Sequence, residues 1–383
     1  MATRRPLRIL MLTDTAILGP GGSERFLRNL LARLPPERFA ADVLQLAAEP
    51  AQSARMADFQ HAHVRLQHRP VRAIYAPAGL AAYRCVRRDV SRGHYDIVQS
   101  QHEKSDLINA CLPRLQGLRR ISNRRDMGFL KSARVRAVLR RVNGRFDRIV
   151  APSRNILDAL VKDERADRTR CRTIVNGVDT HYFRPADASA RARLRAQLGF
   201  VDGECLVGCV ASLTAVKRHC DLLAGLAGAR ERHPNLRLLL VGDGPLREAL
   251  IAQIAALGLR DRVRLLGARA DVENILPALD VFALASSSEG MSNALLEAQA
   301  CGLPAVATSV GGNIDVVRPG RNGILVPPMA PGALAAALGE IAGNASLRRN
   351  FGDAARRTAQ RDYSVEAMVG AYASMYEELA DAH

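Results

Sequence analysis

The chain has 383 residues, 48% of them hydrophobic, which is enough for two domains with separate cores. Its apolar runs are too short to span a bilayer and its seven cysteines lack metal-site spacing, so we expect a cytoplasmic protein. The net charge of +17 would suit nucleic acid, but a 4% aromatic content and the lack of a recognised binding motif argue against that partner.

The excess of positive over negative charge is confined to the N-terminal half of the chain. Residues 1–185 contain 35 basic and 17 acidic residues, whereas the remainder is close to neutral. The density is highest over residues 114–148, called the basic patch below, where residues 131–146 show helical apolar spacing with arginines between. A solvated helix face, an anionic membrane surface and a pyrophosphate-bearing substrate all fit this pattern, so peripheral binding to the inner face of the membrane stays open.

Short apolar strands alternate with amphipathic helices along the chain. In the first half the pattern predicts strands over 9–13, 42–46, 96–99, 120–123, 148–151 and 172–175, and helices over 23–34, 104–115 and 153–161. In the second half it predicts strands over 206–211, 236–241, 263–265, 281–285 and 305–308, and helices over 189–198, 291–301 and 365–381. This alternation is typical of parallel sheets covered on both faces, which bind ligands beyond the carboxyl ends of their strands.

The turn and helix after the strand at 281–285 carry the most distinctive chemistry. Glu289 ends the turn, and Glu297 lies about two turns along the helix that begins near Ser292 or Asn293. Backbone N–H groups at a helix start favour an anion, and carboxylates accept hydrogen bonds from vicinal hydroxyls. On spacing alone, two ordinary glutamates near a helix start would be the simpler interpretation.

The whole stretch resembles the donor-site signature of the retaining glycosyltransferases of family 4. That family continues its second glutamate as Glu-Ala-x-Ala-x-Gly-x-Pro, and this chain has Glu297-Ala298-Gln299-Ala300-Cys301-Gly302-Leu303-Pro304. The resemblance implies the GT-B fold, an α/β architecture of two Rossmann-like domains whose parallel sheets face an interdomain cleft. It places an acceptor-binding domain at residues 1–185, joined by a C-terminal helix at 364–383, and a donor-binding domain at 186–363.

The resemblance also implies a nucleotide-sugar donor site. Glu289 would hold hydroxyls of the donor sugar, Glu297 those of the ribose, and Lys217 the leaving diphosphate, which makes Glu289 and Lys217 the candidate catalytic residues. Ser212 stands where the family has arginine and Arg218 where it has glycine, so Arg218 is a candidate replacement for that cation. The remaining donor-binding candidates are Gly21, Gly22, Arg269, Gly290, Met291, Ser292 and Asn293.

The loops after the strands at 96–99 and 120–123 contain the acceptor-side candidates. His102 lies at a turn where family members often carry a histidine near the acceptor. Arg125 occupies a position where many members place a histidine that touches the donor sugar. Together with Arg124 it forms a pair of arginines, which favours an anionic acceptor.

The resemblance implies transfer of a hexose-type sugar from a UDP- or GDP-sugar to a glycan or lipid-linked acceptor, in the synthesis of cell-surface polysaccharide or glycoconjugate. The departing phosphate would accept the proton of the acceptor, and neither a metal ion nor another cofactor would be needed, because Lys217 and the helix start supply positive charge. Gly242-Asp243-Gly244-Pro245 lacks the third glycine of a dinucleotide fingerprint, so no nicotinamide cofactor is expected. Two other functions stay open: a nucleotide-sugar epimerase of the same fold, and a nonenzymatic subunit that binds a glycan or lipid through the basic patch.

Overall fold

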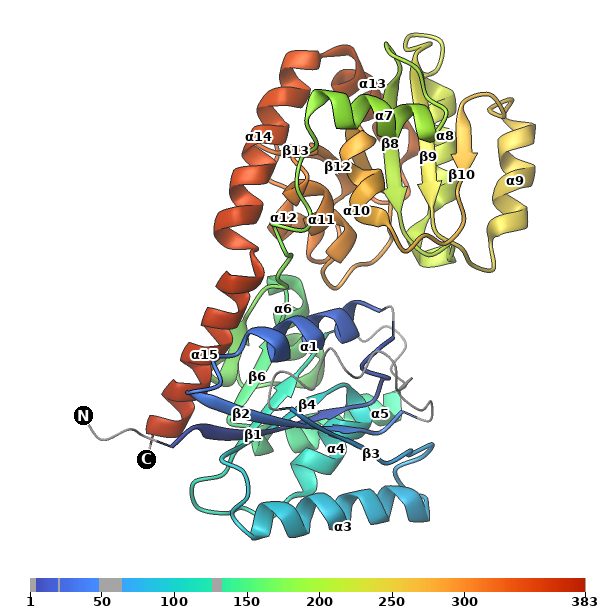
Figure 1. Cartoon of the computed structure of the whole chain (residues 1–383). Helices are drawn as coiled ribbons and strands as arrows, with labels where there is room; N and C mark the ends of the chain where they lie inside the picture. Colours follow the sequence, from blue (N-terminus) through green and yellow to red (C-terminus); the bar gives the residue numbers. More distant parts are fainter. Residues whose placement is uncertain (1–4, 20, 48–63, 126–132, 383) are drawn as a thin grey trace. The chain divides into compact units, whose positions relative to one another are not determined.

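The structure is a computed structural model that describes residues 5–19, 21–47, 64–125 and 133–382. The chain divides into two compact units (Figure 1): an N-terminal unit of Met1–Gly177 with Val365–His383, and a C-terminal unit of Val178–Ser364. The predicted boundary lies after residue 185, so the connector at 178–185 belongs with the C-terminal unit instead. No helix in the described ranges is both long enough and apolar enough to cross a membrane.

The N-terminal unit is built on a parallel sheet whose described strands have the order β3-β2-β1-β4-β5-β6-β7. The strands are β1 (Leu7–Thr13), β2 (Phe39–Gln45), β3 (Arg65–His68), β4 (Ile97–Gln101), β5 (Arg119–Asn123), β6 (Arg148–Ala151) and β7 (Cys171–Thr173). Strand β3 is the one that the apolar pattern does not predict. Apart from Leu66 its residues are polar, and all four are at least partly exposed at the edge of the sheet, so the strand lacks the continuous apolar run of a buried strand.

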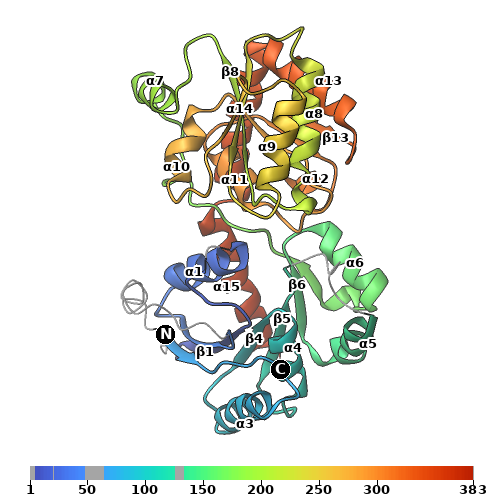
Figure 2. The ribbon, with the colours of Figure 1, turned by 90° about the vertical axis from the view of Figure 1, so that its right-hand side faces the viewer.

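Helices cover both faces of this sheet. They are α1 (Gly22–Arg33), α3 (Pro77–Ser91), α4 (Glu103–Cys111), α5 (Ala133–Val142), α6 (Arg154–Glu164) and α15 (Val365–Asp381), with the short 3₁₀ turns η1 (Asn143–Arg145) and η2 (Arg168–Arg170). Helices α1 and α15 pack on one face, and α3 and α4 on the other (Figure 2). The ring centroids of Phe26 and Tyr372 lie 5.3 Å apart, so the last helix of the chain completes the core beside the first.

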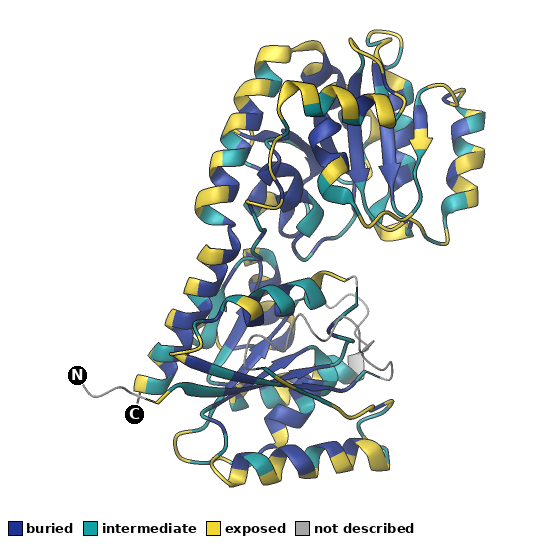
Figure 3. Ribbon diagram, in the orientation of Figure 1, coloured by how far each residue is buried: buried dark blue, intermediate teal, exposed yellow. Residues whose placement is uncertain are grey.

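The C-terminal unit, described in full over residues 178–364, contains a second parallel sheet with the order β10-β9-β8-β11-β12-β13. Its strands are β8 (Cys205–Val210), β9 (Leu236–Val241), β10 (Val263–Leu265), β11 (Val281–Leu284), β12 (Ala305–Thr308) and β13 (Gly323–Val326). The helices are α7 (Ala188–Gln197), α8 (His219–Ala229), α9 (Arg247–Ala256), α10 (Val272–Ile275), α11 (Asn293–Ala300), α12 (Asn313–Val316), α13 (Pro331–Gly343) and α14 (Ala345–Asp362), with 3₁₀ turns η3 (Ala215–Lys217) and η4 (Leu276–Ala278). The central strands are buried on both faces (Figure 3), which is why they read as unbroken apolar runs.

Parallel pairing decides where polar residues gather in each unit. All strand pairs of both sheets run parallel, so the carboxyl ends of neighbouring strands lie at one edge of each sheet. In the C-terminal unit the loops after β8, β11 and β12 share this edge, and in the N-terminal unit the loops after β1, β4 and β5 do so. These two edges contain most of the predicted site residues.

Candidate functional site

Three loops of the C-terminal unit are joined at the carboxyl edge of its sheet. The backbone N–H of Ser287, after β11, donates to the carbonyl oxygen of Val216, after β8, at 2.8 Å. The N–H of Gly312, after β12, donates to the carbonyl oxygen of Gly290 at 3.0 Å. These bonds hold the loops after β8 and β12 against the loop that contains Glu289.

Lys217 and Glu289 form an ion pair within these loops, although they lie 72 positions apart in the chain. Lys217 Nζ lies 2.5 Å from Glu289 Oε1, and Ser286 Oγ donates to the same oxygen at 2.6 Å. Thr308 Oγ1 donates to the carbonyl oxygen of Ser286 at 2.6 Å and so ties the turn to the end of β12. The side chain of Glu289 is 8% exposed and that of Lys217 is 23% exposed, so the cation is the more accessible partner. The structure therefore brings the two predicted catalytic residues together.

Gly311 and Gly312 pack against the backbone of Glu289 and of Gly290, the residue that follows it. Gly311 has a φ of +50°, and a Cβ there would collide with the carbonyl oxygen of Glu289. A Cβ at Gly312 would lie 2.5 Å from the carbonyl oxygen of Gly290. Only glycine permits this approach of two backbones, so the pair determines where the Glu289 turn lies.

A Gly311→Ala variant should be markedly less stable than a Gly320→Ala variant. Both glycines have positive φ, +50° and +73°, where an alanine costs roughly 1–2 kcal/mol. A Cβ at Gly320 would meet no atom within 4 Å, whereas one at Gly311 would push the Glu289 turn aside, at roughly 1–3 kcal/mol more. Thermal unfolding of the two variants measures the difference. Equal losses of stability would show that the Glu289 turn is not held by this contact.

Helix α11 starts beside the ion pair and carries the second glutamate. The predicted helix over 291–301 is present from Asn293 to Ala300, and residues 290–292 lead into it. Ser292 is the N-cap, and its Oγ accepts a hydrogen bond from the backbone N–H three residues later at 3.3 Å. Glu297 is 4% exposed in the middle of the helix. The start of α11 thus places backbone N–H groups near Glu289, an arrangement that favours an anion.

The two arginines predicted to bind the donor are held by neighbouring carboxylates. Arg218 Nε and Nη2 lie 2.9 and 2.8 Å from the oxygens of Asp221, and Arg269 pairs with both oxygens of Asp271 at 2.8 and 2.6 Å. Arg218 also has a φ of +51°, a conformation that suits the glycine of the resembling family. Asp221 engages two of the three guanidinium nitrogens of Arg218, whose side chain is 33% exposed. Arg218 therefore stays a candidate for the replacement cation, with Asp221 as a competing carboxylate.

His219 is a buried residue of this region that no sequence pattern indicates. It opens α8 two positions after Lys217 and is 1% exposed. Neither ring nitrogen has a hydrogen-bond partner among the residues that the structure describes. Burial, aided by the positive charge of Lys217, lowers the pKa of His219 to about 4, so the ring is neutral near pH 7. A lone histidine in the sequence gives no sign of this environment, because it depends on packing.

At the carboxyl edge of the N-terminal sheet, the start of α1 lies against the turn after β4. Gly21 is the N-cap residue of α1, and Gly22 is the first residue of the helix. Because Gly21 has no side chain, no side-chain hydrogen bond caps the helix at this position. His102 has a φ of +87°, and its Nε2 lies 3.0 Å from Ser23 Oγ in the first turn of α1. Asp14 accepts hydrogen bonds from two backbone N–H groups at the start of α4. The structure thus places three predicted residues, Gly21, Gly22 and His102, in one local cluster.

Arg124, predicted as an acceptor-side residue, is buried within the N-terminal unit. Arg124 is 2% exposed, and its guanidinium forms ion pairs with Asp106 and Glu164, each at 2.8 Å. The same group also donates hydrogen bonds to two neutral side chains, at 2.6 and 3.0 Å. Every nitrogen of the guanidinium is therefore used inside the N-terminal unit, and Arg124 stabilises the packing of α4 and α6 on β5.

Arg125, the next residue, has a different environment. Its guanidinium carbon lies 3.8 Å from the ring centroid of Phe26, and Nη2 donates to Asn176 Oδ1 at 2.5 Å. In the described part of the chain, Nε and Nη1 have no hydrogen-bond partner. Burial lowers the pKa of Arg125 to about 10, which leaves it a cation at neutral pH. Arg125 therefore has two donors that no described residue uses, and its acceptor-side role stays a prediction.

Several arginines of the basic patch are engaged within the fold. Arg120 is 3% exposed, and Arg145 donates to the carbonyl oxygens of Ala110 and Leu112 at the end of α4. Lys131 lies outside the described residues. The patch therefore presents less charge to a surface than its composition suggests.

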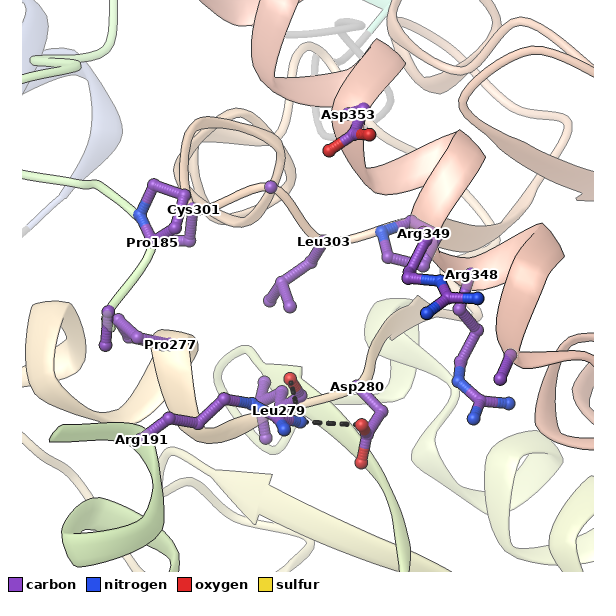
Figure 4. Close-up of a pocket in the computed structure, with 14 residues that line it drawn as sticks. Pro185, Arg191, Pro277, Leu279, Asp280, Cys301, Leu303, Arg348, Arg349 and Asp353 are labelled. Carbon is purple, nitrogen blue, oxygen red and sulfur yellow. Dashed lines mark hydrogen bonds and ion pairs between the residues drawn. The ribbon is translucent and has the colours of Figure 1, made fainter. Parts of the chain in front are cut away.

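A cavity of about 330 Å³ in the C-terminal unit lies at the opposite edge of the sheet (Figure 4). It borders Asp280 and Pro304, which precede β11 and β12. Arg191 reaches into it and lies 2.6 Å from Asp280 Oδ1, while Arg348 donates to two carbonyl oxygens at the end of α13. Ligands of parallel sheets bind at the carboxyl ends of the strands, so this cavity at the amino ends does not compete with the Lys217–Glu289 region as a catalytic site.

Both halves of the chain match known protein families. Residues 190–358 match the model described as Glycosyl transferases group 1, and residues 20–182 match the model described as Glycosyltransferase Family 4. The D-inositol 3-phosphate glycosyltransferase of Salinispora arenicola is 30% identical over 336 residues, covering 80% of this chain and 75% of the relative. The N-acetyl-alpha-D-glucosaminyl L-malate synthase of Bacillus anthracis is 28% identical over 207 residues, covering 54% of this chain and 53% of the relative.

The fold is also similar to that of solved structures. The Anabaena protein HepE, solved in complex with UDP and glucose, superposes with a TM-score of 0.83 at 23% sequence identity. The match covers 97% of this chain and all of that one. It therefore supports the same two-domain architecture over nearly the whole length.

Proposed function

The chain belongs to the glycosyl transferases group 1 family and is a glycosyltransferase of the GT-B fold, and we propose that it is a retaining enzyme that uses a nucleotide-diphosphate sugar. The proposed acceptor is a glycan or lipid-linked molecule, used for cell-surface polysaccharide or glycoconjugate at the cytoplasmic face of the membrane. The observation that carries the proposal is the Lys217–Glu289 ion pair beside the start of α11. It supports the proposal because a cation, backbone N–H groups and a carboxylate lie close together, and a sugar diphosphate can use all three.

In the proposed reaction, the charges of this pair are redistributed when the donor binds. The diphosphate takes the Lys217 ammonium, and Glu289 Oε1 is then released to accept hydrogen bonds from sugar hydroxyls. Ser286 Oγ, 2.6 Å from the same oxygen, keeps the carboxylate oriented during this exchange. Glu297, further along α11, is proposed to hold the ribose hydroxyls. The ion pair thus keeps both groups in place for two different parts of one ligand.

The proposed catalytic step stabilises the leaving group. The bond from the anomeric carbon to the diphosphate oxygen breaks, and Lys217 and the N–H groups of α11 stabilise the charge that develops there. The acceptor oxygen bonds to the anomeric carbon on the same face, and its proton passes to the departing phosphate. Because Lys217 and α11 provide the positive charge, the proposal includes no metal ion or other cofactor.

UDP-sugars are the first donors to test, with GDP-sugars second. The Anabaena protein of the same fold was solved with UDP and glucose, which supports this order. A nucleoside diphosphate at a hundredfold its Kd should stabilise the folded chain by about 2.7 kcal/mol. Thermal unfolding with UDP, GDP and ADP measures this shift, and a Glu297→Gln variant should lose most of it if that residue binds the ribose.

Product analysis then tests the reaction itself. The matching UDP- or GDP-sugar is incubated with and without candidate acceptors, and the anomeric configuration of the product is read by NMR coupling constants. We expect acceptor-dependent release of the nucleoside diphosphate and a product with the configuration of the donor. Interconversion of the donor sugar without an acceptor would identify an epimerase instead, and an inverted product would refute the retaining mechanism.

A further inference from the structure

The cavity of about 330 Å³ at the amino ends of β11 and β12 lies apart from the proposed donor site. Its wall includes Cys301, Gly302 and Leu303, which follow α11 and lead into β12. Helix α11 has eight residues, a length of about 12 Å, and its first turn lies at the other end, beside the loop of Glu289. A molecule in the cavity therefore does not occupy the place of a donor.

Three arginines from two helices line this cavity. Arg191 belongs to α7, and Arg348 and Arg349 lie near the start of α14 (Figure 4). Burial and the charge of Asp280 raise the pKa of Cys205, at the start of β8, to about 11, while the charges of Arg348 and Arg191 act in the opposite direction. Guanidinium groups from both helices are therefore close enough to act on one thiol at this edge of the sheet.

The carboxylates at the cavity do not balance these cations. Asp280 is shared by two arginines, because Arg191 and the buried Arg195 lie 2.6 and 2.9 Å from its two oxygens. Asp353, one turn of α14 after Arg349, is exposed and forms no ion pair within the C-terminal unit, which is described in full. With Arg195 included, four positive charges face two negative ones, so an excess of two positive charges remains.

Arg348 and Arg349 keep most of their hydrogen-bond donors. Within the fully described C-terminal unit Arg348 uses only Nη1, which donates to the carbonyl oxygens of Ile341 and Ala342 at 2.7 and 2.6 Å. Arg349 has one long contact there, 3.5 Å from Nη2 to Ser346 Oγ. Neither arginine forms an ion pair in that unit. Two adjacent guanidinium groups with unused N–H donors suit the oxygens of a phosphate, which they can bind in a bidentate manner.

The remaining wall of the cavity is largely apolar. Pro277, Leu279, Leu303 and Pro304 line it, and all four are buried. A volume of about 330 Å³ lies at the lower end of the range of small-molecule pockets, about 300–1,000 Å³. The cavity therefore has room for a small apolar body attached to the phosphate.

We propose that this cavity is a second ligand site, which binds a small phosphomonoester. Arg348 and Arg349 bind the phosphate, and the apolar wall around Leu279 and Leu303 contacts the body of the molecule. A phosphomonoester carries a charge of about −1.5 to −2 at neutral pH, which matches the excess of two positive charges, whereas a carboxylate supplies only one negative charge. The site goes beyond the transfer reaction and does not depend on the donor site.

Titration calorimetry of the full chain tests this site with three probes of similar body: phenyl phosphate, benzoate and uncharged benzyl alcohol. Each titration is made without and with saturating UDP, which fills the proposed donor site. We expect the wild-type protein to bind phenyl phosphate more tightly than the other two probes, with the same affinity whether UDP is present or not. Arg349→Gln should weaken this binding roughly 10- to 100-fold, the range for a hydrogen-bonded charge.

Arg357 provides a matched control, because it is an exposed arginine of the same helix, two turns further along α14 and outside the cavity. Arg357→Gln should bind phenyl phosphate as the wild type does. Arg348 also donates to the end of α13, so the milder Arg348→Lys is used there and should retain only part of the affinity.

Three results would overturn the site: no binding of phenyl phosphate, equal affinities in the Arg349 and Arg357 variants, or benzoate bound as tightly as phenyl phosphate. Displacement of phenyl phosphate by UDP would also overturn it, since the probe would then occupy the donor site. A wild type that binds phenyl phosphate but neither UDP nor GDP would refute the donor site alone.

Discussion

A Lys217→Ala variant should transfer sugar roughly 100- to 1,000-fold more slowly than the wild-type enzyme, the usual effect of removing one group that stabilises developing negative charge. Lys217 Nζ, 2.5 Å from Glu289, is the accessible cation of the proposed donor site. Its loss removes charge stabilisation from the leaving diphosphate and also the partner that holds Glu289. Steady-state kinetics with a saturating acceptor separate these effects, since the first lowers kcat and the second raises the KM for the donor.

Arg218→Ala is the control for this prediction. Arg218 is the next residue and also a cation, but its guanidinium is bound to Asp221. We expect its removal to change kcat less than 10-fold, because Asp221 already binds its guanidinium and the proposed phosphate-binding cation is Lys217. A larger loss from Arg218→Ala than from Lys217→Ala would show that Arg218 is the phosphate-binding cation after all.

An Arg124→Ala variant should destabilise the N-terminal unit by about 3–5 kcal/mol. The substitution leaves Asp106 and Glu164 buried without their common counter-ion, and breaking a buried pair from one side costs this much. Because the chain has two units, a single unfolding midpoint would mix their stabilities. Hydrogen exchange of amides in β5 and α6 reports the N-terminal unit by itself.

The neighbouring Arg125→Ala variant should lose far less stability, although it removes the same side chain one position along. Arg125 forms no ion pair with a carboxylate in the described residues, and Glu24 acts on it only through its charge, so its removal breaks no buried ion pair. Similar losses of exchange protection in the two variants would mean that Arg125 is also a structural residue.

Much of the fold could be predicted because its strands are buried on both faces. Strands such as β8 and β11 read as continuous apolar runs between helices, which is the signature of a parallel sheet. Strand β3 escaped this pattern because it lies at the sheet edge with exposed polar side chains. Strand β3 pairs with β2 through backbone groups, which every residue type has, so the amino-acid sequence does not reveal this pairing.

The site could be predicted only in part. The glutamates at 289 and 297 and Lys217 were recognisable because each lies in a motif of neighbouring residues. Arg124 and Arg125 were indistinguishable, because burial against acids far away in the chain separates their roles, and no local pattern records it. His219 gave no signal either, since a lone polar residue reveals nothing until its neighbours and its missing hydrogen bonds are known.

By itself, the sequence determined the family, the alternation of strands and helices, and the loop and helix that contain Glu289 and Glu297. These features depend on residues close together in the chain, whose spacing reflects hydrophobic burial and helix capping. Only the tertiary structure decided that Lys217 meets Glu289 across 72 positions and that Arg124 is structural. These contacts arise because parallel pairing brings the carboxyl ends of strands that are distant in the chain to one edge of the sheet. Which polar groups at that edge have a hydrogen-bond partner then depends on how the surrounding residues pack.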